Sequence, residues 1–180
     1  MILGGGSGGA RSRELILWFD VIGVWGDIRR TMAIKITEAL LAEHVVFHNL
    51  FDSIEEALPT LKTLREVQVL GRVLESMLDA HSKVEDELII EPLDHCFEQI
   101  GQHDTFHQEH EEIDAALGAC LASSQVGKAR DYLRQAVVGS RRHFDKEERL
   151  IFPMAEKHLK AKTLLGLGER WKEERKAIVG

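Results

Sequence analysis

The chain has 180 residues, 44% of them hydrophobic and 29% charged, which is typical of a globular protein with one substantial core. Its 23 basic and 30 acidic residues give a net charge of −7 without a concentrated basic patch, which argues against a general nucleic-acid binder. No segment reaches the ~20 apolar residues of a membrane span. The two cysteines, Cys96 and Cys120, form no CxxC pair, so we expect reduced thiols in a cytoplasmic protein.

Residues 1–31 are interpreted as an N-terminal extension. The stretch MILGGGSGGARSRE is Gly-rich, as flexible tails are. The following segment, Leu15–Trp25, is apolar but short, and Asp20 interrupts it, which disfavours a signal peptide. The helical pattern begins at Met32, an alternative start of the chain. The competing interpretation is a short amphipathic segment that docks on the domain or on a partner.

Two long helices are predicted next. Apolar residues and histidines recur every three or four positions between Ile34 and Leu58, which is the period of an amphipathic helix. A second stripe of this kind runs from Leu61 to Ile90. Pro92 is expected to end the second helix, because proline lacks a backbone N–H, and His95 then lies in a loop.

Two further long helices complete the pattern. The third runs from about His103 to Leu121, where the turn-rich stretch ASSQVGK follows. The fourth runs from about Ala129 to Phe152, and Pro153 is expected to kink it rather than stop it.

The fold class follows from these elements. A shorter amphipathic segment covers Leu164–Ile178, and no run alternates at period two, so no sheet is expected. Four long helices with short links predict an all-α protein, an up-down-up-down four-helix bundle over residues 32–160. A C-terminal helical tail is expected over residues 161–180.

One motif occurs twice, as HSKVEDELIIEP from His81 and as HFDKEERLIFP from His143. Each copy has Glu four residues after His, then a second acid, then Leu and Ile at offsets seven and eight, then Pro. Residues four apart share one helix face, and here that face is the apolar one. A buried carboxylate is costly unless it is paired or binds a metal, so Glu85 and Glu147 predict a metal site.

Histidines on the other two apolar stripes complete the predicted site. Each of the four helices brings at least one imidazole inward, and the predicted metal ligands are His44, His81, Glu85, His110, His143 and Glu147. Two carboxylates can bridge two ions and leave two imidazoles for each ion. This donor set suits Fe, Mn or Zn, and the absence of thiolate disfavours an iron–sulfur cluster. No catalytic motif appears, neither a nucleophile elbow nor a P-loop nor a dinucleotide fingerprint.

These motifs resemble those of the hemerythrin-like family, the HHE cation-binding domain, from about Met32 to Arg175. The resemblance is carried by LLAEHVVFHNLF, the two His-x3-Glu motifs, HQEHEEIDAAL and the tail LGLGERWKEER. It implies two non-heme iron ions with bridging carboxylates and an oxo or hydroxo bridge. It also implies chemistry with oxygen, nitric oxide or peroxide at an open iron position.

The chain departs from the pattern of the oxygen-carrying hemerythrins, which have His-x3-His on helix three and His-x4-Asp on helix four. Here helix four has His-x3-Glu, and the His-x3-His pair is His103 and His107, before His110. We expect His110 to be the ligand, with His107 and His103 as alternatives or as a fifth histidine of the site. The departure disfavours simple oxygen storage and favours a sensor or a protein that handles iron.

Several polar residues near the predicted ligands are not expected to bind metal themselves. Those beside the ligands are expected to be solvated or to orient ligand histidines, namely Asp86, Glu111, Glu112 and Glu148. His48 is expected to be a half-buried surface residue, and Trp171 a packing anchor.

Three functions remain open. The preferred one is a di-iron protein that binds or senses a small ligand or handles iron. The second is an enzyme on the same centre, for peroxide or nitric oxide reduction or iron–sulfur repair. The third is a metal-free helical interaction module. The sequence names no protein partner.

Overall fold

The computed structural model describes residues 33–100 and 103–179, and within them the side chains of residues 33–95 and 108–177. Every regular element in these ranges is helical, which confirms the predicted all-α class. None of these helices combines the length and the apolar character needed to cross a membrane. The interpretation of residues 1–31 concerns a segment outside the described residues.

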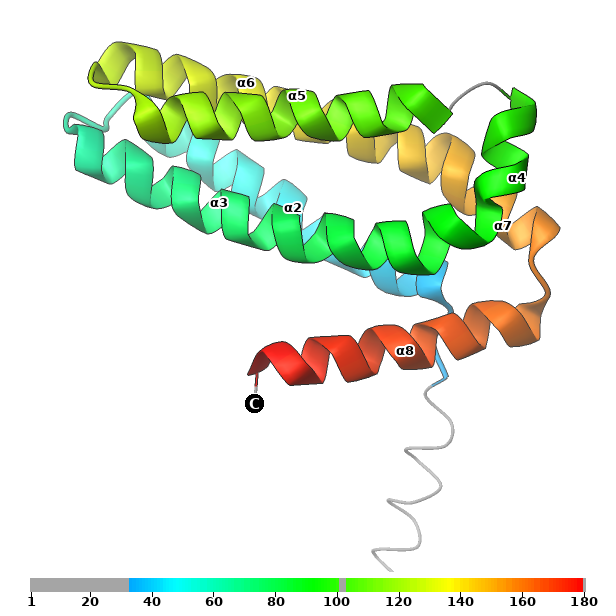
Figure 1. Cartoon of the computed structure of the whole chain (residues 1–180). Helices are drawn as coiled ribbons and strands as arrows, with labels where there is room; N and C mark the ends of the chain where they lie inside the picture. Colours follow the sequence, from blue (N-terminus) through cyan, green and yellow to red (C-terminus); the bar gives the residue numbers. More distant parts are fainter. Residues whose placement is uncertain (1–32, 101–102, 180) are drawn as a thin grey trace, which may run out of the picture. The chain divides into compact units, whose positions relative to one another are not determined.

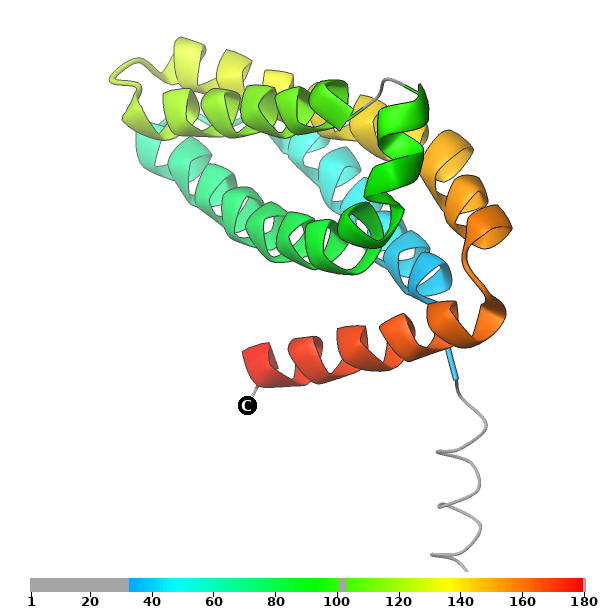
Figure 2. The same ribbon diagram turned by 45° about the vertical axis from the view of Figure 1, so that its right-hand side comes forward.

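Four long helices lie side by side in both ribbon views (Figures 1 and 2). They are α2 (Ile36–Ala57), α3 (Leu64–Glu85), α5 (His103–Ala122) and α6 (Val126–Lys146). Their starts lie within a few residues of the predicted ones, but α3 and α6 end before the predicted Ile90 and Phe152 because another helical segment follows each. The start of α3 shows why the boundaries are sharp. The Thr63 hydroxyl accepts a hydrogen bond from the Glu66 backbone N–H, and the Glu66 carboxylate accepts one from the Thr63 N–H.

Both His-x3-Glu motifs run into a short π-helical segment. The segment η1 (Asp86–Ile90) leads into α4 (Glu91–Ile100), and η2 (Glu147–Ile151) leads into α7 (Phe152–His158). Each π segment ends two residues before a proline, Pro92 or Pro153.

The prolines account for these wider turns. A proline ring clashes with the carbonyl four residues earlier, and that carbonyl lies inside the π segment in both cases. The prediction that Pro92 ends the second helix is therefore wrong, because the chain stays helical through η1 into α4. His95 is consequently an exposed helical residue instead of a loop residue. At Pro153 the chain also stays helical, as expected.

The core consists of two apolar clusters, with the predicted ligands at the junction between them. On α2, Leu40 belongs to one cluster and Phe47 to the other, and His44 lies between them in sequence. On α3, His81 lies in the same way between Leu78 and Val84. Apolar packing on both sides holds the polar layer in place.

The C-terminal helix α8 (Ala161–Val179) packs against α2. Leu164 and Leu167 belong to the same apolar cluster as Leu40. At Gly168 the helix approaches the backbone of Ile34 so closely that a Cβ atom would collide with the Ile34 carbonyl group. A glycine is therefore required at the point where α8 meets the start of α2.

Candidate metal centre

The structure brings all six predicted ligand residues together. Five of them have buried side chains: His44, His81, Glu85, His143 and Glu147. The sixth, His110, keeps 14% of its side chain exposed. They come from α2, α3, α5, α6 and the first residue of η2.

The first group of potential ligand atoms consists of Glu85, His110, His143 and Glu147, whose donor atoms all lie within 4.8 Å of one another. The Nε2 atoms of His110 and His143 are 2.7 Å apart. His143 Nε2 is 2.6 Å from Glu147 Oε1, and His110 Nε2 is 3.9 Å from Glu85 Oε2. We call this set the α5 half of the centre.

The second group consists of His44, His81 and Glu147, again within 4.8 Å. The two Nε2 atoms are 3.3 Å apart, and His44 Nε2 is 3.1 Å from Glu147 Oε2. We call this set the α2 half. Glu147 belongs to both halves and directs one oxygen toward a histidine of each, which is the arrangement of a bridging carboxylate.

Three of the histidines have a carboxylate on the outer side of the ring. His44 Nδ1 lies 2.9 Å from Glu148, His81 Nδ1 lies 2.7 Å from Glu43, and His143 Nδ1 lies 3.0 Å from Glu109. An ionised carboxylate only accepts hydrogen bonds, so each Nδ1 carries a proton and each Nε2 atom faces inward.

These outer carboxylates follow a rule that the sequence analysis missed. Glu43, Glu109 and Glu148 each stand next to a predicted ligand in sequence, but each contacts a histidine on another helix. Glu148 was among the residues expected to be solvated or to orient a ligand, and it orients His44. Glu43 and Glu109 could have been singled out because each is the acidic residue directly before a predicted ligand, His44 or His110. Sequence adjacency could not show which helix they face.

The inward atoms provide a test of whether the residues fit a metal. With Nδ1 protonated, His44 and His81 direct two Nε2 lone pairs at each other across 3.3 Å, which is repulsive without a proton or a cation between them. Both oxygens of Glu85 and of Glu147 are buried and make no hydrogen bond to any described residue, although the His–Glu147 distances are short. A cation would satisfy all of these atoms, so the donor set fits a metal.

Electrostatics in this layer separate the two glutamates. Burial and the neighbouring Glu147 raise the pKa of Glu85 well above its usual range. Burial opposes ionisation of Glu147 too, but the charge of His143 and the close contacts with His143, His44 and Glu85 together outweigh it and hold the Glu147 pKa well below its usual range. Burial likewise lowers the pKa of His143, but Glu147 and Glu109 together raise it. These shifts favour one protonated and one ionised glutamate in the metal-free layer.

The remaining singled-out residues lie away from the inward atoms. His48 is partly exposed, as expected, and its Nδ1 lies 3.2 Å from an Arg141 nitrogen. Glu112 is exposed and pairs with Arg142, which makes it a suitable control residue. The side chains of His103 and His107 are outside the described ones, so the alternatives to His110 stay open.

Comparison with known proteins gives a partial match. Searches of curated proteins and of solved structures found no match. The family model of the hemerythrin HHE cation-binding domain matches residues 101–178, the part that contains His110, His143 and Glu147, and the family recognised from the motifs is therefore confirmed over this part of the chain.

Proposed function

We propose that this protein is a non-heme di-iron protein that binds or senses oxygen, nitric oxide or peroxide, or handles iron. In this proposal the four long helices form an up-down-up-down bundle of the hemerythrin type, in the cytoplasm, and the two ions lie in its interior. The observation that carries the proposal is the set of unsatisfied inward atoms. Two buried glutamates without hydrogen bonds and two opposed imidazole lone pairs all require positive charge at one place.

The residues divide naturally between two ions. His110, His143 and Glu85 would hold one, His44 and His81 would hold the other, and Glu147 would bridge them. Glu85 belongs to the α5 half, and its predicted role as a second bridge is supported by its position beside Glu147. The outer carboxylates keep the Nε2 atoms directed inward before any ion arrives.

Bound iron would supply a redox change and an open coordination position for a small ligand. The chain supplies an apolar setting for the α2 half, because Phe144 stacks on the His44 ring with centroids 3.9 Å apart and Phe47 lies 5.2 Å from the His81 ring. Apolar walls favour a small uncharged ligand over a hydrated ion. The His-x3-Glu motif on helix four favours sensing or iron handling over simple oxygen storage.

Metal analysis with an optical spectrum tests the proposal. Protein loaded anaerobically with Fe(II) and then exposed to air should hold about two irons per chain and show a near-ultraviolet band of an oxo-bridged diferric centre. Parallel loading with Mn(II) or Zn(II) tests the choice of metal. Less than about half an equivalent of iron without the band would refute the di-iron proposal. Turnover of peroxide or nitric oxide by the loaded protein would favour an enzyme over a sensor.

A further inference from the structure

The side chain of Glu43 links the α2 half of the centre to the C-terminal helix α8. One of its oxygens lies 2.7 Å from His81 Nδ1. Trp171 Nε1–H donates a hydrogen bond to the other oxygen at 2.7 Å. Arg175 donates to both oxygens, from Nε at 2.6 Å and from a terminal nitrogen at 2.9 Å. Glu43 therefore accepts from two residues of α8 and one predicted metal ligand.

The charge and packing of this cluster make it a firm support. Burial opposes ionisation of Glu43, but the hydrogen bonds from His81, Arg175 and Trp171 lower its pKa to about 2. A planar guanidinium that contacts both carboxylate oxygens fixes the carboxylate plane as well as its charge. The Trp171 ring also packs against the apolar cluster that contains Leu40. The carboxylate has little freedom to turn away from His81.

Arg175 has a further contact that points to the same histidine. Its remaining terminal nitrogen donates to the backbone carbonyl of Ala80 at 2.9 Å, one residue before His81. One side chain thus holds both the carboxylate that orients His81 and the backbone that carries it. Arg175 keeps only 21% of its side chain exposed, so solvent competes weakly for these bonds.

The corresponding supports elsewhere in the centre come from inside the four long helices. Glu109, which faces His143, is contacted by Lys146 of α6 at 3.4 Å. Glu148, which faces His44, lies 3.9 Å from His48 of α2. Among the described residues, a helix beyond these four supports the outer carboxylate only at His81.

We propose that α8 is the positioning element of the α2 half, with Arg175 and Trp171 holding Glu43 so that His81 Nε2 faces the metal. The inference rests on the proposed function. Loss of an outer carboxylate contact typically costs 10–100-fold in metal affinity. Because coupling is reciprocal, an ion in the α2 half also strengthens the docking of α8. Metal occupancy is thereby communicated to the C-terminal helix.

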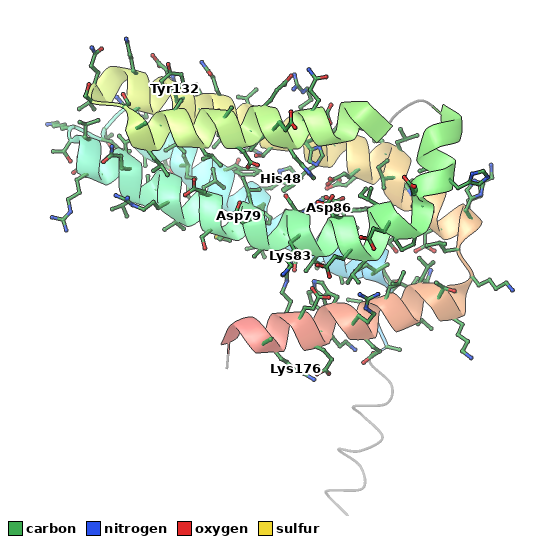
Figure 3. The ribbon with its side chains drawn as sticks, viewed as in Figure 1. His48, Asp79, Lys83, Asp86, Tyr132 and Lys176 are labelled. Atoms are coloured by element: carbon green, nitrogen blue, oxygen red, sulfur yellow. The ribbon has the colours of Figure 1, made fainter. Side chains whose placement is uncertain are left out.

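Metal release from the intact chain tests this inference. Iron-loaded protein is mixed with an excess of chelator, and loss of the two ions is followed by the diferric spectrum and by metal analysis. Trp171→Phe keeps an aromatic ring in the apolar cluster and removes only the N–H donor. Arg175→Ala removes the guanidinium, and Arg175→Lys retains the charge without the planar fork. Lys176→Ala is the matched control, because Lys176 is exposed on the outer side of α8 and, among the described residues, pairs with Glu173 one turn away (Figure 3).

We expect Trp171→Phe and Arg175→Ala to speed release of one ion about 10-fold or more and to leave the other unchanged. Arg175→Lys should lie between Arg175→Ala and the wild type, and Lys176→Ala should match the wild type. Glu109→Gln should speed release of the other ion, from the α5 half. Hydrogen exchange of the α8 backbone should slow when the wild type is loaded with iron, and should not respond to iron in Arg175→Ala.

Two outcomes would overturn the inference. If the variants released both ions faster by the same factor, α8 would be a general structural support. If they released neither ion faster, Glu43 would need no help from α8. Circular dichroism checks folding, and Trp171→Phe decides the matter if Arg175→Ala does not fold. A wild type that binds no metal refutes the proposed function itself, which is distinct from a wild type that binds two ions and variants that behave like it.

Discussion

The two halves of the centre differ in how they are enclosed. In the α5 half, His110 is partly exposed and borders a small cavity of about 10 Å³, which Ser82 and Asp114 also line. In the α2 half, both histidines are buried, and the cavity beside His81 is an apolar one of about 250 Å³, lined by Val46, Phe47 and Met77. A space of 10 Å³ holds about one water molecule.

The two halves have similar ligand residues but different surroundings. In the α5 half a ligand histidine, His110, is itself partly exposed, beside a polar seam formed by Ser82 of α3 and Asp114 of α5. The α2 half is enclosed by aromatic rings and is supported by α8. Ligands of the same chemical type can therefore differ in exchange rate because their surroundings differ.

The largest effect is expected from the residue that both halves share. Glu147→Ala should reduce the bound iron from about two ions to fewer than one per chain, because each half loses an oxygen ligand at once. Metal analysis after loading measures this. Glu112→Ala, which removes an exposed carboxylate, should retain both ions. Equal retention in both variants would show that Glu147 bridges nothing.

Metal removal should have the next largest effect. Binding to the folded state alone adds about 3–4 kcal/mol at a hundred to a thousand times the dissociation constant, which corresponds to roughly 5–15 °C for a chain of this size. Thermal melts followed by circular dichroism, with and without chelator, measure the shift. The metal-free chain should stay helical, because apolar clusters flank the polar layer on both sides. Identical melting temperatures with and without chelator would mean that no bound metal stabilises the folded chain.

Truncation of one histidine in each half should lower the stability of the metal-free protein by different amounts. His44→Ala should cost about 2–4 kcal/mol of unfolding free energy, since it removes a buried ring stacked on Phe144. His110→Ala should cost about 1 kcal/mol, because solvent can enter its partly exposed site. Urea denaturation of both variants with chelator present gives the comparison. A larger loss for His110→Ala would contradict the enclosure described for the α2 half.

The smallest effect concerns the polar seam of the α5 half. Burial and the nearby Asp79 raise the pKa of Asp114, so its ionised form is less favourable in the folded than in the unfolded chain. Stability should therefore fall as pH rises from the unfolded pKa, near 3.8, through the raised folded value. Asp114→Asn should raise the unfolding free energy at pH 7 by less than about 1 kcal/mol, because solvent screens a group that is mostly exposed.

Thermal melts at pH 7 and at pH 4 test this prediction. The gain from Asp114→Asn should be present at pH 7 and should shrink at pH 4, where the wild-type carboxyl gains its proton. Asp131→Asn, at an exposed aspartate that pairs with Arg134, serves as the control. A gain of equal size at both pH values would mean that charge at Asp114 is not the cause.

The sequence by itself determined the all-helical class, the approximate bounds of the long helices and the six inward side chains. These follow from local periodicity, because residues three or four apart share a helix face wherever that helix packs. The repeated His-x3-Glu motif needed no partner helix to place His and Glu together. The sequence did not predict that the chain would stay helical at Pro92, because a π turn can absorb a proline that otherwise ends a helix.

Only the tertiary structure decided which carboxylate orients which histidine and what supports it. Glu43 is next to His44 in sequence but faces His81, and Arg175 reaches Glu43 from a helix more than a hundred residues later. The packing of α5 and α8 leaves one half of the polar layer with a partly exposed histidine and the other half with both histidines buried. These features depend on the relative positions of helices, which side-chain periodicity within one helix does not encode.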